Sequence, residues 1–278
     1  MDRILLIDGL NFIHRGNITF NQIEKTEVSY TIVYNFFRNL RAAVEEFQPT
    51  KVFFCLESAN CFRYKLFPGY KSNRIIKVSD DKTAAKLKSR EDFNRQRDII
   101  IDLLPNLPIT IVNALEFEAD DVIATLVENL KDEEVIIYSG DKDFTQLLQK
   151  DYPNLKLYSP NKKDYVSAPE WNHLTYLSLI GDKVDGIPSV VGPKKAEKLA
   201  TDVNAFAEFL DSSEEKKANY ALNLSLIKLV IVPDERLQFI EHNTNYDVLK
   251  ARFAQMEFES ILEDKYWDRF QKTFANLR

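Results

Sequence analysis

The chain of 278 residues contains only two cysteines and three histidines. Cys55, Cys61 and three scattered histidines cannot supply a zinc cage of recognisable spacing, so we expect reduced, structural thiols. No N-terminal basic and apolar segment precedes a small-residue cleavage site, so we expect no leader. No apolar run approaches the roughly 20 residues that span a bilayer. These absences predict a soluble, intracellular protein that does not enter a membrane.

Two nucleotide-binding signatures are missing as well. No strand-like segment is followed by a glycine-rich dinucleotide fingerprint or by a GxxxxGK loop, which argues against a cofactor oxidoreductase and an ATPase. A phosphatase with an aspartate nucleophile at a strand end would need a second aspartate two residues after Asp8, where Leu10 stands. The enzyme class that remains is metal-assisted hydrolysis.

The composition, 45% apolar and 12% aromatic, permits a substantial core, either in one large domain or in one domain with an appendage. The net charge is −6, but the distribution of charge is uneven. Residues 62 to 98 carry eleven basic side chains against five acidic ones. This basic block is either a solvated helix face or a phosphate-binding surface, and its composition leaves both open.

Strand-like and helix-like segments alternate in the first two thirds of the chain. Residues 3–7, 51–56, 109–112 and 134–138 are short apolar runs typical of parallel strands, and residues 28–48 and 119–130 have helical periodicity. This pattern predicts an α/β fold with a central, mostly parallel sheet flanked by helices. Strand signals fade after Gly181. We therefore expect a core over residues 1–180 and a smaller helical domain over residues 181–278.

Acidic residues follow three of the expected strands. Asp8, Glu57, Asp141 and Asp143 stand just beyond apolar runs, so they should meet at one edge of the sheet, where open α/β sheets bind ligands. Taken singly, each has an ordinary explanation as a turn, a helix cap or a surface residue. Their shared position is what points to a site.

Two further clusters strengthen this interpretation. Glu118, Asp120 and Asp121 crowd the start of a predicted helix, and Asp182 and Asp185 are three residues apart. If all nine acids converge, their mutual repulsion requires bound cations. Carboxylate oxygens with retained waters are the ligands that Mg²⁺ and Mn²⁺ prefer.

Five motifs carry a resemblance to a known family. They are, in chain order, LLIDGLN, FRYKLFPGYKSNR, EADD, SGDKDFTQLL and LIGDKVDGIP. Together they resemble the 5′-nuclease superfamily of flap endonucleases and polymerase-associated 5′-exonucleases, over most of residues 3–200. DFTQLL followed by PNLKLYSP is most similar to the branch formed by the ribonucleases H of T-even-type phages. The resemblance implies a PIN-like nuclease core, a helical arch at about residues 70–100 and a helical C-terminal domain with a shortened helix-hairpin-helix.

The resemblance also implies two divalent ions, Mg²⁺ or Mn²⁺, and their ligands. The ligands implied for the first ion are Asp8, Glu57, Glu118, Asp120, Asp121 and Asp141, and those for the second are Asp143, Asp182 and Asp185. Glu57 replaces the family's usual aspartate, so it is expected to act through water or with altered geometry. The resemblance places Lys71 and Arg74 at the scissile phosphate, and we expect Asp121 and Asp141 to be essential for cleavage.

Nucleic-acid contacts are implied for the arch and for the hairpin sequence GIPSVVGPKKAEKL, which retains only Gly186 and Gly192. The residues concerned are Arg63, Tyr70, Lys71, Arg74, Lys77, Lys82, Lys86, Lys88, Lys194, Lys195 and Lys198. Tyr70 is expected either to stack on a base or to belong to the core.

The implied function is metal-dependent 5′ to 3′ cleavage of DNA and RNA·DNA duplexes with 5′ ends or flaps, including removal of RNA primers during replication. The protein is expected to be a monomer in the cytoplasm, that of a bacterial host if it is phage-encoded. A PIN-type ribonuclease and a catalytically silent binder of branched nucleic acid are the alternatives. A single-strand DNA-binding protein and a sliding clamp are the implied partners. Tyr266, Trp267, Phe270 and Phe274 would either dock one of them or form core.

Overall fold

The computed structural model describes residues 1–18, 29–58, 60–72 and 81–278, and Arg74 and Lys77 lie outside these ranges. The strands are β1 (Arg3–Asp8), β2 (Lys51–Cys55), β3 (Thr110–Ala114), β4 (Glu134–Tyr138), β5 (Leu155–Ser159), β6 (Asp164–Val166) and β7 (Leu237–Ile240). The helices of the N-terminal part are α1 (Gly9–Ile18), α2 (Thr31–Phe47), α3 (Arg63–Leu66), α4 (Asp81–Leu103) and α5 (Ala119–Asn129), with the 3-10 turns η2 (Leu104–Asn106) and η3 (Asp143–Gln149). The later helices are α6 (His173–Ile180), α7 (Pro193–Thr201), α8 (Val203–Asp211), α9 (Glu214–Ile227), α10 (Tyr246–Gln255), α11 (Glu259–Leu262) and α12 (Asp264–Phe274), with the turn η4 (Asp234–Arg236).

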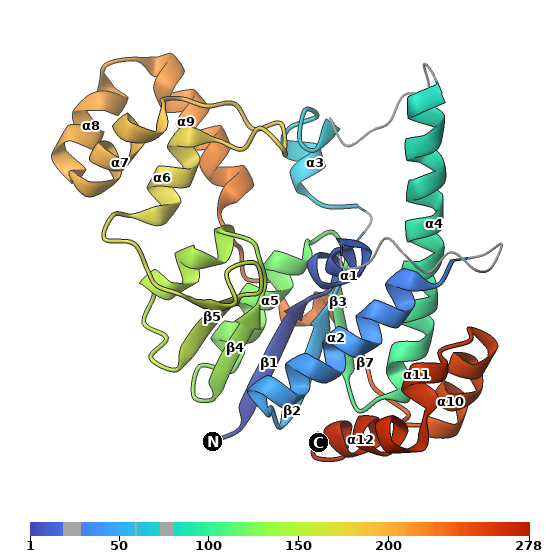
Figure 1. Cartoon of the computed structure of the whole chain (residues 1–278). Helices are drawn as coiled ribbons and strands as arrows, with labels where there is room; N and C mark the ends of the chain where they lie inside the picture. The colour runs from blue at the N-terminus through green and yellow to red at the C-terminus, as the bar shows by residue number, and fades with distance from the viewer. Residues whose placement is uncertain (19–28, 59, 73–80) are drawn as a thin grey trace.

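A seven-stranded sheet with the order β6-β5-β4-β1-β2-β3-β7 forms the centre of the molecule (Figure 1). Its five inner strands are parallel, and β6 and β7 are antiparallel at the two edges. The predicted mostly parallel sheet is therefore confirmed. The chain runs outward from β1 to β3 and then returns to the other side of β1 as β4. This reversal opens a crevice at the carboxyl ends of β1 and β4.

Strand β1 explains why its sequence is apolar without interruption. Leu5 and Ile7 belong to the hydrophobic cluster on one face of the sheet, and Ile4 and Leu6 belong to the cluster on the other. Successive strand residues point to opposite faces, so a central strand covered on both sides needs apolar side chains at every position.

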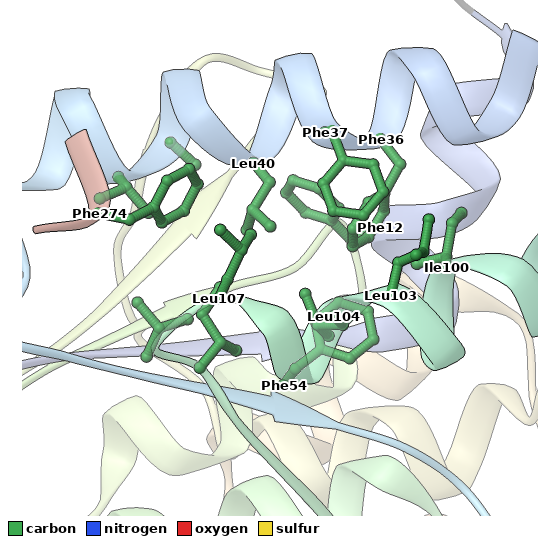
Figure 2. Close-up of a cluster of buried hydrophobic side chains, with 14 of the residues drawn as sticks. Phe12, Phe36, Phe37, Leu40, Phe54, Ile100, Leu103, Leu104, Leu107 and Phe274 are labelled. Carbon is green, nitrogen blue, oxygen red and sulfur yellow. The ribbon is translucent and has the colours of Figure 1, made fainter. Parts of the chain in front are cut away.

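The larger cluster lies between the sheet and helix α2. Figure 2 shows Phe36, Phe37 and Leu40 of this helix facing Phe54 of β2 and Leu104 of η2. Each of these five side chains is completely buried. The predicted helical periodicity of this segment thus corresponds to its buried face.

Helix α4 runs away from the sheet in Figure 1, and its last turns join the core through Ile100 and Leu103. Lys86 and Lys88 lie exposed on its outer part, and Lys82 belongs to its first turn. This helix is the part of the predicted arch that the structure describes. None of the described helices is long and apolar enough to cross a membrane.

The C-terminal third departs from the expectation of helices alone. Strand β7 pairs with β3, with Val112 opposite Phe239, and extends the sheet at its edge. Helices α10 to α12 pack on the α2 side of the sheet, whereas α6 to α9 form clusters of their own at the other end of the molecule. The division into residues 1–180 and 181–278 stays a prediction.

The terminal aromatic residues belong to the core with one exception. Trp267, Phe270 and Phe274 are 5%, 1% and 0% exposed, while Tyr266 is 49% exposed. The interpretation of the first three as exposed anchors for a partner is wrong, because helix α12 turns its apolar stripe toward Phe253 of α10.

Candidate functional site

The carboxyl ends of β1, β2 and β4 and the start of α5 border a pocket of about 200 Å³. Seven of the nine predicted acids line it, namely Asp8, Glu57, Glu118, Asp120, Asp141, Asp143 and Asp185. Asp121 and Asp182 lie outside its lining. The sheet edge therefore gathers side chains from separate parts of the sequence, as the strand-end positions predicted.

Asp8, the last residue of β1, is held by two neighbours that were not among the site residues predicted from the sequence. Ser139 Oγ donates a hydrogen bond of 2.7 Å to Asp8 Oδ2, and the Asn11 backbone N–H donates one of 3.3 Å to Oδ1. Burial, opposed by Ser139 but reinforced by the charges of Asp141 and Glu57, raises the pKa of Asp8 to about 6.

The loop after β4 is a compact turn that points two carboxylates at the same pocket. Ser139 Oγ accepts a hydrogen bond of 3.0 Å from the Asp141 N–H, and Asp141 Oδ1 accepts one of 2.8 Å from the Asp143 N–H. Burial and the charge of Asp141 raise the pKa of Asp143 to about 8. The turn thus holds two acids together against their repulsion.

Asp120 completes this acidic side of the pocket. Burial raises its pKa well above the ordinary value, and the charges of Asp141 and Asp8 raise it further. The pKa of Asp141 is raised by burial in the same way. A set made only of carboxylate oxygens, each disfavoured as an anion by its neighbours, has the chemistry of a divalent-cation site.

The arrangement does not by itself reproduce a closed coordination shell. Across the described parts of the chain, no group of three or more His, Cys, Asp or Glu side chains is placed so that it could hold one ion. Mg²⁺ commonly binds through one or two carboxylates and keeps several waters. The donor chemistry therefore suits such an ion with water filling much of its shell.

Glu118 also lines the pocket, and positive charge and hydrogen-bond donors balance it. Tyr70 Oη donates a hydrogen bond of 2.9 Å to Glu118 Oε2, and Lys71 Nζ forms an ion pair with Oε1. Tyr70 is only 4% exposed and packs among Leu177, Ile187 and other apolar side chains. This burial fits the core alternative for Tyr70, which also lines the pocket, and base stacking stays a prediction.

Lys71 occupies a strained and enclosed position. Its φ is +54°, a left-handed conformation that is unusual for a residue with a Cβ. Its N–H donates a hydrogen bond of 2.8 Å to the carbonyl oxygen of Asp185, and its side chain is 10% exposed. Such strain persists where the surroundings fix it, which is common at functional sites.

Asp121 and Arg63 correct the sequence prediction most clearly. The two side chains form a bidentate ion pair, with Nη1 to Oδ2 at 2.5 Å and Nη2 to Oδ1 at 2.9 Å. Arg63 is 2% exposed and Asp121 is fully buried. Asp121 is therefore held in a buried ion pair outside the pocket lining, a placement that does not fit its predicted role as a metal ligand. Arg63 lines the pocket, with its guanidinium engaged inside the protein.

Asp182 is also placed differently from the prediction. Its carboxylate pairs with Lys142 Nζ at 3.2 Å and accepts the Val184 N–H at 2.8 Å. Burial raises its pKa, but these partners outweigh burial and the net shift is downward. Asp182 shapes the turn before Asp185, which does line the pocket.

The predicted hairpin lysines lie apart from the pocket. Lys194, Lys195 and Lys198 are all exposed on α7, which begins at Pro193 after the N-cap Gly192. In Figure 1, α7 and α4 stand on opposite sides of the carboxyl ends of the strands. Two groups of exposed lysines thus flank the acidic pocket.

Besides Ser139 and Asn11, the sequence reading missed His14, which lines the pocket and stacks on Phe93 of α4 at 4.2 Å between ring centroids. Asn11 and Ser139 stand in the motifs LLIDGLN and SGDKDFTQLL, so proximity to the strand-end aspartates was a usable signal. No sequence signal pointed to His14, because its position depends on how α1 meets α4.

Comparisons with known proteins agree with this geometry. A family model described as the 5′-3′ exonuclease N-terminal resolvase-like domain matches residues 3–173. The chain is 25% identical to a 5′-3′ exonuclease of Aquifex aeolicus, over 95% of each protein. It is 26% identical to a thermostable DNA polymerase I of Thermus filiformis, where the match takes in 94% of the chain and 33% of the polymerase. The chain thus spans about a third of that relative.

Solved structures share the fold. The D15 protein of bacteriophage T5, co-crystallised with metal ions, has a TM-score of 0.65 and 15% identity, with 99% of each chain covered. The same phage's D15 flap endonuclease in a complex with DNA and metal ions has a TM-score of 0.64 and 16% identity, with 98% of each chain covered. At this identity the likeness concerns the fold.

Proposed function

The chain belongs to the 5′-3′ exonuclease family, whose N-terminal resolvase-like domain it carries over residues 3–173, and we propose that it is a divalent-metal-dependent 5′ to 3′ nuclease. It would hydrolyse phosphodiester bonds near the 5′ ends of DNA or RNA. The observation that carries the proposal is the convergence of seven carboxylates on one pocket at the strand ends.

The ions would be held by the acidic side of the pocket, where Asp8, Asp120, Asp141 and Asp143 all have a raised pKa. Asp185 and Glu57 line the same pocket and would complete the ligand set. When bound, a pair of Mg²⁺ or Mn²⁺ ions supplies an activated water and neutralises charge on the phosphate and on the leaving oxygen. The T5 flap endonuclease was solved with DNA and metal ions, which is in keeping with a metal-dependent activity for this fold.

The residues of the chain itself would orient the phosphate. The Lys71 ammonium, held at the pocket by its pair with Glu118, would contact a phosphate oxygen and stabilise the negative charge that grows in the transition state. Tyr70 and Arg63 hold Glu118 from the other side, so the lysine has a fixed anchor. Arg74, outside the described residues, would add a second phosphate contact.

The exposed lysines would bind the nucleic acid without reading its sequence. Lys86 and Lys88 of α4 would contact the single-stranded 5′ segment, and Lys194, Lys195 and Lys198 of α7 would contact the phosphates of the adjoining duplex. Removal of RNA primers during DNA replication is the role we propose for this activity.

The test is a set of 5′-labelled substrates, namely a flap, a nicked duplex and an RNA·DNA hybrid, incubated with Mg²⁺ and with EDTA. We expect short 5′ products from at least one substrate, formed only with Mg²⁺, and their lengths would distinguish exonuclease from flap-endonuclease action. Tight flap binding without cleavage under every metal condition would instead indicate a silent binder. Cleavage of single-stranded RNA alone would indicate a PIN-type ribonuclease.

A further inference from the structure

A buried charged pair stands at the pocket. Arg63 of α3, which lines the pocket, and Asp121 of α5, which does not, meet fork to fork, and their side chains are 2% and 0% exposed. A buried pair of this kind is retained only when its remaining donors and acceptors are satisfied. The hydrogen-bond partners of Arg63 and Asp121 therefore show which part of the protein this pair supports.

Those partners belong to the chain segment that leaves α9 and crosses along the pocket wall. Arg63 Nε donates a hydrogen bond of 2.7 Å to Leu226 O, and Nη2 donates one of 3.0 Å to Lys228 O. Asp121 Oδ1 accepts the Val230 N–H at 3.1 Å. Three backbone groups of one segment thus depend on this pair.

The crossing segment, defined here as residues 226–232, forms part of the pocket wall. Leu226, Ile227 and Leu229 line the pocket together with the acids. Residues 228–232 follow the end of α9 and have no hydrogen-bond ladder of their own, so side-chain donors and acceptors help to fix their position. The pair fixes this wall together with Gln146, which donates to Ile227 O at 3.3 Å and accepts the Leu229 N–H at 3.0 Å.

The same pair reaches the acidic side through the start of α5. Asp121 Oδ2 accepts the Glu118 N–H at 3.3 Å as half of a capping box. Arg63 Nη1 also lies 3.3 Å from Glu118 Oε2, the oxygen that Tyr70 contacts. Moving the pair would therefore move Glu118 and the Lys71 side chain that it holds.

From this geometry we infer that Arg63 and Asp121 are positioning residues of the proposed nuclease: they fix the crossing segment and the Glu118–Lys71 pair and touch neither metal nor nucleic acid. The inference rests on the proposed function for what is positioned. All three guanidinium nitrogens and both carboxylate oxygens are engaged within the protein. The pair is thus occupied in holding the fold of the site.

The test compares Arg63→Lys and Asp121→Asn with Asp141→Asn, which removes a pocket carboxylate. Arg236→Met is the control, because it breaks an arginine–carboxylate pair with Glu116 at the surface. Three quantities are measured for each protein: Mn²⁺ affinity by calorimetry, amide hydrogen exchange of residues 226–232, and single-turnover cleavage of a labelled flap.

We expect both positioning variants to speed amide exchange in the crossing segment and to lower the cleavage rate by about tenfold or more, as loss of supporting interactions does at metal sites. Their Mn²⁺ affinity should stay within about threefold of the wild type, whereas Asp141→Asn should lose about tenfold or more. The Arg236→Met control should match the wild type in all three measurements.

Loss of Mn²⁺ affinity in Asp121→Asn equal to that in Asp141→Asn, with unchanged exchange, would show that Asp121 is a ligand and overturn the inference. Weaker flap binding by Arg63→Lys with unchanged exchange and rate would show a nucleic-acid contact. If a single variant does not fold, the apolar pair Arg63→Met with Asp121→Leu replaces it, and wild-type cleavage by that double variant rejects the positioning role. If the wild type itself neither binds nor cleaves the flap, the proposed function fails, while exchange and Mn²⁺ affinity still decide whether the pair is structural support.

Discussion

The carboxylates of the pocket differ in what surrounds them, and this difference governs their protonation. Burial and neighbouring acids raise the pKa of Asp8 to about 6 and the pKa of Asp143 to about 8. The pKa of Asp182 is lowered because Lys142 and backbone N–H groups outweigh the effect of its burial. Without bound ions, the carboxyl groups with a raised pKa make the folded protein less stable at any pH at which they must ionise.

This difference predicts how stability depends on pH. The unfolded chain releases these protons near the ordinary pKa of 3.8, whereas folded Asp8 and Asp143 keep them to about 6 and about 8. The folded state binds more protons in this range, so the free energy of unfolding in EDTA should fall as the pH rises from about 4 to about 8 and then level off. Urea unfolding at a series of pH values measures this fall.

Two variants sharpen that measurement. Asp143→Asn should flatten the upper part of the fall and raise the unfolding free energy at high pH, because it removes a repelled charge. Saturating Mn²⁺ should stabilise the wild type most at high pH, where the carboxylates are ionised. The exposed Asp151→Asn is the control. A stability that rises between about pH 5 and about pH 8 in EDTA would contradict this account.

Lys71 gives the second prediction at this scale. Lys71→Ala should lower the single-turnover rate by about 100-fold and weaken flap binding much less, because its charge is needed mainly in the transition state. The control is Lys65→Ala, which removes an exposed lysine that pairs with Glu116. An unchanged chemical rate with a large loss of affinity would assign Lys71 to binding alone.

At the scale of elements, α4 combines two parts with different tasks. Its last turns are anchored through Ile100 and Leu103, while its outer part presents Lys86 and Lys88 to solvent. The outer part of α4 has little apolar surface to bury, so its projection from the core does not stabilise the fold. This part is therefore available to bind nucleic acid.

The double variant Lys86→Ala with Lys88→Ala should therefore weaken flap binding. It should also reduce the slope of log Kd against the logarithm of the salt concentration by the amount that corresponds to about two phosphate contacts. The single-turnover rate at saturating protein should stay near that of the wild type. Lys265→Ala with Lys272→Ala, which removes two exposed lysines at the far end of the molecule, is the matched control. Equal effects from both double variants would mean that only net charge matters.

At the scale of the whole molecule, the C-terminal end of the described chain returns to the start of β2. The backbone N–H of Arg278 donates a hydrogen bond of 2.9 Å to Thr50 O beside the start of β2. Phe270 and Phe274 of α12 join the cluster that contains Phe37 of α2. The last helix thus closes the core that the N-terminal strands and helices begin.

Deletion of residues 260–278 should consequently unfold the protein and not merely remove a docking site. The milder variant Phe270→Ala should lower the free energy of unfolding by about 3–5 kcal/mol, since its side chain is only 1% exposed. Tyr266→Ala, at an exposed position on the same helix, is the control. A truncated protein that stays folded with full basal cleavage would return this helix to the role of a partner surface.

The sequence alone determined the features that depend on local order. Uninterrupted apolar runs predict buried parallel strands, and acids directly after them predict a shared sheet edge, so the sheet and four of the seven pocket acids, Asp8, Glu57, Asp141 and Asp143, could be anticipated from strand ends. Motif order indicated the family. Neither inference depends on which side chains contact each other in the folded protein.

Only the tertiary structure decided which charges meet. Asp121 stands one residue from Asp120, yet it turns away from the pocket to pair with Arg63, because successive residues of a helix point in different directions. Strand β7 forms because the edge of β3 offers unpaired backbone groups. Trp267, Phe270 and Phe274 are core because α12 folds back on α10, a contact that no local pattern specifies.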